Sequence, residues 1–403
     1  MNTTNNSYPL LHRHQKAPFA LLPDRSWVFP FPDCYAICRG EPRYGVVPRA
    51  VSIGRILRDP PDHDKRAAAV SPQTLLSRAD PRKMAVYTEV SDEDLAAFVA
   101  SYDIGGLLSY KGIAEGVENT NYLMQTDRGQ FILTLYEKRV SASDLPFFLN
   151  LMEFLAEAGI PSPTPLHGRD GKALRTLCDR PAAIITFLNG MSPKRMKVCH
   201  CAEVGAALAR FHNAGANFDM SRPNGLSVDA WRPLFNSSAA RADEVIPGLA
   251  EILSKELDFL EANWPDNLPK GVCHADLFPD NVFFLGDKLS GLIDFYFACN
   301  DFLIYDLAIC LNAWCFERDN SFNVTKARRM LAAYRRERST SDAEIAALPT
   351  IARGAAIRFL LTRLYDWLNH PEGAFVKPKD PHEYLSILQF HQRVTTPGEY
   401  GMD

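Results

Sequence analysis

The chain has 403 residues, with 44 Lys or Arg against 48 Asp or Glu, so its formal net charge is −4. This balance argues against a nucleic-acid-binding protein that depends on a general basic field, and the 46% hydrophobic content is ordinary for a globular protein. The sequence contains no run of about 18 apolar residues and no secretory signal, so we expect a cytoplasmic protein without a membrane-spanning helix.

Residues 1–83 differ in composition from the rest of the chain. They contain 11 of the 28 prolines and 13 Lys or Arg against 7 Asp or Glu. The segment has no sustained periodicity, so we predict an irregular, proline-rich basic extension and a natural start at Met84. A basic targeting segment is the alternative, against which the seven acidic residues argue.

Residues 84–187 are predicted to form a small N-terminal lobe rich in strands. Its first helix begins at a capping box of Ser91 and Asp94. A tight turn over 127–129 then indicates a hairpin. The strands are expected over residues 104–110, 122–126, 130–136 and 182–187, and a second helix over 144–158.

Residues 188–403 are predicted to form a larger, mainly helical lobe. A loop over 274–281 precedes the one hairpin of this region, with strands over 282–285 and 289–294. The two regions together predict an α+β fold with two lobes. The helical patterns cover residues 201–213, 240–263, 301–316, 322–336, 342–370 and 381–392.

The nine cysteines are expected to be reduced thiols, because most of them lie in apolar runs. Cys34 with Cys38, and Cys199-His200-Cys201, have the local spacing of metal ligands. Neither group has a second pair of ligands at the distance that a zinc site requires, so we predict no zinc there.

The strongest functional signal is the segment His274-Ala-Asp276-Leu-Phe-Pro-Asp-Asn281, followed by Asp294 after the next strands. Phosphoryl transfer requires a carboxylate that orients the attacking hydroxyl, together with an amide oxygen and a second carboxylate that hold Mg²⁺ against the phosphates. We therefore predict Asp276 as the base and Asn281 and Asp294 as metal ligands. His274 is predicted to brace the loop through a buried hydrogen bond, with Asp306 as its partner.

A glycine-bearing segment, Gly112 to Gly116, lies between two predicted strands upstream of this motif. The backbone N–H groups of such a turn can cover phosphates. The segment lacks the full G-x-G-x-x-G pattern, and neither a P-loop nor a Rossmann fingerprint occurs in the chain. We therefore expect ATP to bind under this turn.

From Met84 onward the chain resembles the homoserine kinases of the phosphotransferase type, in the superfamily of aminoglycoside phosphotransferases and choline kinases. The stretches YKGIAEGVENTNYL, RPAAIITFLNGM and GVCHADLFPDNVFFLGDKLSGLIDFYF carry the resemblance. It implies a bilobal, protein-kinase-like fold and transfer of the ATP γ-phosphate to L-homoserine in threonine biosynthesis. A kinase of the same superfamily for choline, ethanolamine or an aminoglycoside is the alternative, and a nucleotide-binding pseudoenzyme is another.

The resemblance also implies a nucleotide loop over 112–121 and a hinge that holds the adenine after the 182–187 strand. Thr134 stands where many relatives have a lysine for the α- and β-phosphates. Lys138 is a candidate to replace that lysine, and Glu153 is a candidate for its glutamate partner. The residues predicted to bind the nucleotide are Gly112, Gly116, Asn119, Asn121, Lys138, Phe187 and Leu188.

Homoserine is a zwitterion, so its site must offer a cation to the carboxylate. Arg358 and Arg363 lie on one predicted helix and are the candidates, because an arginine fork binds a carboxylate through two bonds. The alternative is that both lie on a solvated helix face. Tyr296 is a third candidate, although aromatic residues of this kind more often belong to the core.

Overall fold

The computed structural model describes residues 88–113, 119–137, 141–370 and 378–402. They belong to the second of the two units into which the chain divides, Leu76–Asp403. The predicted extension 1–83 lies outside the described residues, and so do Gly116 and Lys138.

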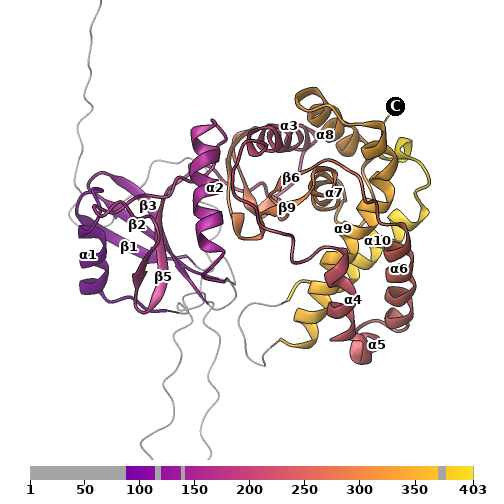
Figure 1. Ribbon diagram of the computed structural model, residues 1–403, viewed down its shortest axis with the longest axis horizontal. Coiled ribbons are helices and arrows are strands. Elements are labelled where there is room, and N and C mark those ends of the chain that lie inside the picture. Colours follow the sequence, from indigo (N-terminus) through magenta and orange to yellow (C-terminus); the bar gives the residue numbers. More distant parts are fainter. Residues whose placement is uncertain (1–87, 114–118, 138–140, 371–377, 403) are drawn as a thin grey trace, which may run out of the picture. The chain divides into compact units, whose positions relative to one another are not determined.

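A five-stranded antiparallel sheet with the order β1-β2-β3-β5-β4 forms the first part of the described chain (Figure 1). The hairpin predicted at 127–129 is confirmed, because Thr126 pairs with Gly129 across a two-residue turn. The first strand begins later than predicted, because Gly105 adopts a φ of +82° and turns the chain there. The strands are β1 (Leu107–Gly112), β2 (Asn119–Thr126), β3 (Gly129–Tyr136), β4 (Arg175–Leu177) and β5 (Arg180–Thr186).

The sheet lies between α1 (Asp92–Ala100) and α2 (Leu145–Glu157) (Figure 1). Successive side chains of a strand point to opposite faces, and β3 follows this rule. Leu133 and Leu135 pack in the cluster that contains the buried face of α1. Tyr136 belongs to the other cluster, which contains α2. Thr134 shares the face of Tyr136 and therefore points toward the side of the sheet on which α2 lies.

The second part of the described chain is mainly helical, as predicted, but it contains two small antiparallel pairs. One pair is β6 (Lys270–Cys273) with β9 (Cys299–Phe302), and the other is β7 (Val282–Leu285) with β8 (Lys288–Leu292). The helices are α3 (Val198–Gly215), α4 (Val228–Asn236), α5 (Ala242–Val245), α6 (Leu249–Asn263), α7 (Leu303–Trp314), α8 (Val324–Glu337), α9 (Asp342–Leu368) and α10 (Pro381–Arg393).

Two of the predicted helices are wrong in their bounds. The pattern over 240–263 is interrupted after Val245, because Gly248 takes a left-handed φ of +78° and a new helix begins behind it. The pattern over 301–316 starts too early, because Cys299–Phe302 pairs with β6 before α7 begins. Sequence reasoning also missed α4, whose nine residues include an internal proline.

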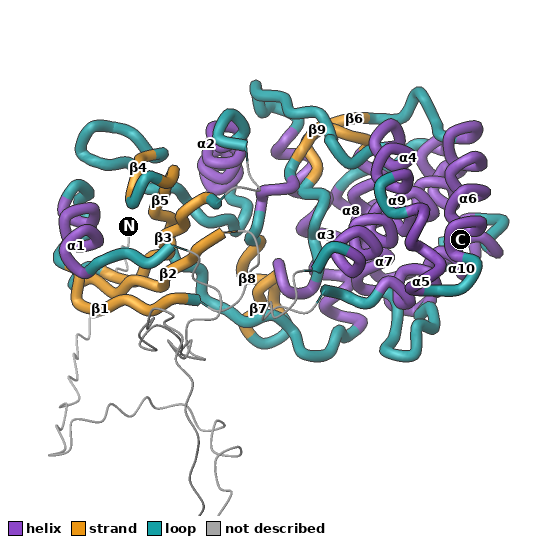
Figure 2. Tube along the Cα trace, turned by 90° about the horizontal axis from the view of Figure 1, so that it is seen from below, coloured by secondary structure: helices purple, strands orange, loops and turns teal. Residues whose placement is uncertain are grey.

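Helix α9 is the longest helix of the described chain, and it packs against α7 and α10 (Figure 2). Its length and composition alone would let it cross a membrane. However, its glycine at 354 lies against the rings of Trp231 and Trp264, with no room for a side chain. Helix α9 is therefore a core helix of this part of the chain, and one of its side chains contacts the loop described next.

Candidate active site

The loop that carries the predicted base connects β6 to β7 and is fixed by two buried groups. Asp306 of α7 accepts hydrogen bonds from the backbone N–H groups of His274 (2.7 Å) and Ala275 (2.9 Å). The side chain of His274 pairs instead with the carbonyl oxygen of Ile293, at 3.0 Å from Nε2. The predicted hydrogen bond between His274 and Asp306 thus exists, but Asp306 binds the backbone N–H of His274. The imidazole binds Ile293, the residue that follows β8, instead.

His274 is fully buried, and burial lowers its pKa, so the ring is neutral. A neutral imidazole has one donor and one acceptor nitrogen. Because Nε2 must donate to the Ile293 carbonyl, Nδ1 accepts the N–H of Asp276 at 3.3 Å. His274 therefore holds the backbone of the predicted base and contributes no proton of its own.

Asp306 has a second partner that sequence reasoning missed. His212 of α3 lies 3.1 Å from Asp306 Oδ2 and 2.8 Å from the hydroxyl of Tyr334. Burial alone would raise the pKa of Asp306, but the hydrogen bonds from His212 and from the backbone of His274 hold it below its usual value. The carboxylate stays ionised inside the core, and no local sequence signal links residue 212 with residue 306.

The backbone is strained on either side of the predicted chemistry. Ala275 has a φ of +61° and Asp294 a φ of +64°, a left-handed region that costs a residue with a side chain roughly 1–2 kcal/mol. Such conformations persist only where surrounding contacts enforce them, and they concentrate at active sites. Here they stand immediately before Asp276 and at Asp294 itself.

Asp276 and Asn281 are held together as one unit. The side-chain amide of Asn281 donates to the backbone carbonyl of Asp276 (2.8 Å) and to its Oδ2 (3.1 Å). Both donors of the amide are directed at Asp276, so Oδ1 of Asn281 is the atom left for a cation. Burial raises the pKa of Asp276 to about 6, against the lowering effects of Arg358, Lys379 and Asn281.

The hairpin of β7 and β8 brings the two predicted metal ligands to one place. Val282 pairs with Leu292, and the N–H of Ile293 donates to the carbonyl of Asn281 at 3.0 Å. Asp294 is the next residue, and its side chain is exposed. An amide oxygen and a carboxylate are hard oxygen ligands, so this donor set fits Mg²⁺.

The residues predicted to cover the phosphates lie on the first two strands of the sheet. Gly112 ends β1, and Asn119 and Asn121 begin β2. The side chain of Asn121 accepts the hydroxyl of Thr134 at 2.8 Å. Thr134 is thus buried and neutral, and it does not supply the charge of the lysine that many relatives have.

The predicted hinge, Phe187 and Leu188, follows β5 and is attached to the same hairpin. Leu188 packs on Gly291 of β8, and the hydroxyl of Ser290 donates to the carbonyl of Asn189 at 2.7 Å. An isolated bridge then pairs Met191 with Phe284 of β7. The segment predicted to hold the adenine and the hairpin that carries the predicted metal ligands therefore form one connected structure.

The three predicted substrate residues are placed differently from one another. Arg358 is 2% exposed and donates from Nη1 to the carbonyl of Ala275. Arg363 is 7% exposed and pairs with Glu383 at 2.6 Å. The alternative of a solvated helix face is therefore wrong for both arginines. Tyr296 is half-buried, with its hydroxyl 3.3 Å from that of Tyr136.

Glu153, the candidate partner for the missing strand lysine, has a different neighbour in this structure. Its carboxylate lies 2.9 Å from Nε2 of His167. His167 also contacts the carbonyl of Gly171, and these hydrogen bonds raise its pKa. The pair joins α2 to the loop before β4.

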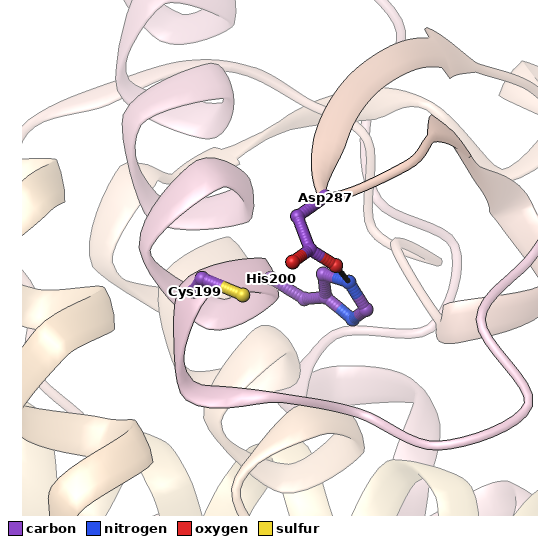
Figure 3. A group of neighbouring side chains, drawn as sticks. All are labelled: Cys199, His200 and Asp287. Carbon is purple, nitrogen blue, oxygen red and sulfur yellow. Dashed lines mark hydrogen bonds and ion pairs between the residues drawn. The ribbon is translucent and has the colours of Figure 1, made fainter.

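Cys199 and His200 begin α3 close to Asp287 in the turn between β7 and β8 (Figure 3). The potential ligand atoms of these three side chains lie within 4.8 Å of one another. However, the Nζ of Lys197 already pairs with Asp287 Oδ1 at 2.7 Å, and His200 Nε2 lies 3.1 Å from the same oxygen. The group thus already contains a cation, Lys197, and its contacts attach α3 to the hairpin.

The other cysteine of the predicted metal-like spacing, Cys201, is buried, and its thiol donates to the carbonyl of Trp314.

Comparisons with known proteins agree with this arrangement. Residues 109–339 match the model of the phosphotransferase enzyme family. The homoserine kinase of Rhodospirillum rubrum is 66% identical over 319 residues, which cover 79% of this chain and 99% of that protein. The homoserine kinase of Bradyrhizobium diazoefficiens is 66% identical over 320 residues, which cover 79% of this chain and 98% of that protein.

Solved structures with low sequence identity share the fold. An amicoumacin kinase has a TM-score of 0.56 at 16% identity, with 75% of this chain and 92% of that chain covered. A spectinomycin phosphotransferase has a TM-score of 0.55 at 12% identity, with 78% and 98% covered. The choline kinase of Cryptosporidium parvum has a TM-score of 0.53 at 13% identity, with 71% and 88% covered. The predicted two-lobed, kinase-like α+β fold is confirmed.

Proposed function

The chain belongs to the phosphotransferase enzyme family and, within it, to the homoserine kinases, and on this premise we propose how its residues phosphorylate L-homoserine. The reaction moves the γ-phosphoryl group of ATP to the hydroxyl of homoserine and gives ADP and O-phospho-L-homoserine, a step of threonine biosynthesis. The observation that carries the assignment is the 66% identity to a homoserine kinase over almost its full length, together with the loop that holds Asp276 and Asn281.

Asp276 orients the hydroxyl of homoserine and accepts its proton as the new O–P bond forms. The Nδ2 of Asn281 binds Oδ2 of Asp276, which leaves Oδ1 for the substrate. A pKa of about 6 makes Asp276 mostly ionised at neutral pH while it remains more basic than an ordinary aspartate. Catalysis by this family rests mainly on positioning and electrostatics, and the clamped loop supplies the positioning.

Asn281 Oδ1 and the carboxylate of Asp294 would hold Mg²⁺, which supplies positive charge against the phosphates when bound. Asp294 follows β8 with a φ of +64°, and the hydrogen bond from Ile293 to the carbonyl of Asn281 joins the chain segments that carry the two residues. ATP and Mg²⁺ are therefore the expected cosubstrate and metal.

The nucleotide is proposed to bind between the first two strands of the sheet and the hinge. Gly112, Asn119 and Asn121 would face the phosphates, and the backbone of Phe187 and Leu188 would face the adenine, which fits the connection between hinge and hairpin. Gly116 and Lys138 stay predicted nucleotide residues outside the described part of the chain.

Arg363 and Tyr296 stay predicted contacts of the amino-acid substrate. We further propose that the enzyme acts in the cytoplasm on this small molecule and needs neither nucleic acid nor a membrane. The near-neutral charge and the internal position of α9 support that proposal.

The decisive measurement is ADP release by the purified protein with ATP and Mg²⁺. L-Homoserine is compared with choline, ethanolamine, L-serine and kanamycin at equal concentrations. We expect turnover with homoserine to exceed that with every other acceptor. Faster turnover with choline or kanamycin would reject homoserine as the substrate. Absence of turnover with all five would favour the pseudoenzyme alternative.

A further inference from the structure

Arg358 is a buried cation whose position calls for an explanation. It lies in α9 with 2% of its surface exposed, and it forms no ion pair with any carboxylate in the described part of the chain. Its guanidinium stands 4.5 Å from the ring centre of Phe359 and 5.4 Å from that of Phe297. Burial of a charge without an ionic partner is costly, so a polar contact must compensate for it.

That contact is the backbone of the catalytic loop. Nη1 of Arg358 donates to the carbonyl oxygen of Ala275, the residue immediately before Asp276. The carbonyl belongs to the peptide group that leads into the predicted base, so its orientation fixes the start of Asp276. Nε of Arg358 has no hydrogen-bond partner among the described residues and is buried, so a substrate carboxylate does not reach this nitrogen.

Asp306 holds the same short segment from the other direction. Its two carboxylate oxygens accept the N–H groups of His274 and Ala275. The carboxylate of Asp306 in α7 therefore binds the two N–H groups, and the guanidinium of Arg358 in α9 binds the carbonyl of Ala275 that follows them. Between the two contacts Ala275 adopts its φ of +61°, a conformation that alanine avoids when it is not enforced.

We propose that Arg358 is a positioning residue that holds the Ala275 carbonyl and thereby aims Asp276 at the attacking hydroxyl. This inference rests on the proposed kinase function and replaces the earlier expectation that Arg358 binds the carboxylate of homoserine. Arg358 touches no substrate in this role. It acts through Ala275, whose left-handed backbone conformation it stabilises.

The test measures steady-state kinetics of Arg358→Met and Arg358→Lys with ATP and L-homoserine. Methionine fills similar space without a donor, whereas lysine keeps one donor and the charge. Because a small misplacement of a reacting group can cost about 100-fold, we expect Arg358→Met to lower kcat about 100-fold with both KM values within about threefold of the wild type. Arg358→Lys should have a kcat at least about tenfold higher than that of Arg358→Met.

Arg353→Met is the matched control. Arg353 lies on the same helix, stacks on Phe259 and pairs with the buried Glu256 at 2.7 Å. Its loss should lower thermal stability without changing kcat. If Arg353→Met and Arg358→Met lower kcat equally, the effect of residue 358 is merely structural and the proposal is wrong.

A second variant isolates the role of the strained residue. Glycine adopts positive φ without the penalty of alanine, so Ala275→Gly combined with Arg358→Met should recover kcat about fivefold over Arg358→Met alone. No recovery would mean that Arg358 does not act through Ala275. Should Arg358→Met fail to fold, Arg358→Lys with and without Ala275→Gly gives the same comparison.

The acceptor 3-amino-1-propanol, which is homoserine without its carboxylate, separates positioning from substrate binding. A positioning residue gives the same loss of kcat with both acceptors. If instead KM for homoserine rises with kcat unchanged, and the defect vanishes with the aminoalcohol, Arg358 binds the carboxylate and the proposal is overturned. A wild-type enzyme that ignores homoserine would refute the proposed function, and the Arg358 comparison would then be made with the alcohol that it accepts.

Discussion

Replacing Asp276 with asparagine should lower the rate of catalysis and raise the free energy of unfolding. The substitution removes the base and keeps the side-chain shape and the acceptor for Asn281. We expect turnover to fall by about 10²- to 10⁴-fold, the usual contribution of general acid–base catalysis. ATP binding should persist, because Asp276 does not belong to the predicted nucleotide contacts.

The same substitution should stabilise the folded protein at neutral pH. Burial raises the pKa of Asp276 from 3.8 to about 6, so the fold disfavours the ionised side chain. Two pKa units correspond to about 3 kcal/mol. The wild type carries this penalty fully above about pH 6 and loses it progressively as the pH falls from 6 toward 3.8, since the carboxyl is protonated in both states only below that value.

The assay is urea unfolding of the wild type and Asp276→Asn without Mg²⁺, followed by tryptophan fluorescence at pH 7.5 and at pH 4.5. Asp276→Asn should exceed the wild type in free energy of unfolding by up to about 3 kcal/mol at pH 7.5, and by much less at pH 4.5. An equal difference at both pH values would show that the carboxylate is not destabilised by burial. Loss of ATP binding in the variant would refute the role given to Asp276.

Three further results are expected. In a pH series with the wild type, kcat/KM for homoserine should fall about tenfold per unit below pH 6, because the base must be ionised, and a profile flat to pH 5 would contradict this. Asn281→Ala should raise the Mg²⁺ concentration needed for half-maximal rate, since it removes one of two predicted ligands, and an unchanged Mg²⁺ dependence would exclude Asn281. Asp306→Asn should lower the free energy of unfolding by about 3 kcal/mol or more in a urea titration, because a buried, multiply bonded charge is lost, and a neutral result would count against the clamp.

The sequence predicted the positions of side chains well where spacing alone determines them. Asp276 and Asn281 lie on one short loop, and a hairpin of fixed register must return Asp294 to the same end. The strands around 127–129 were predictable for the same reason, because a two-residue turn sets the register of its neighbours.

Features that depend on tertiary packing were not predictable. The helical pattern of α9 does not say that the guanidinium of Arg358 points into the core and reaches Ala275. The pairing of His212 with Asp306 joins residues 94 positions apart, and no local pattern links the two. Strands of three or four residues such as β4 and β6 are too short for a period to be recognised.

The β7–β8 hairpin is attached to segments on the sheet side of the molecule as well as to the helical part. Two segments are fastened to this hairpin. Leu292 donates to the carbonyl of Pro161, in the loop between α2 and β4, at 2.8 Å, and Met191, in the segment after β5, bridges Phe284. We therefore expect the hairpin, this loop and the predicted hinge to move as one body, so that Asn281 and Asp294 keep their distance from the predicted adenine site.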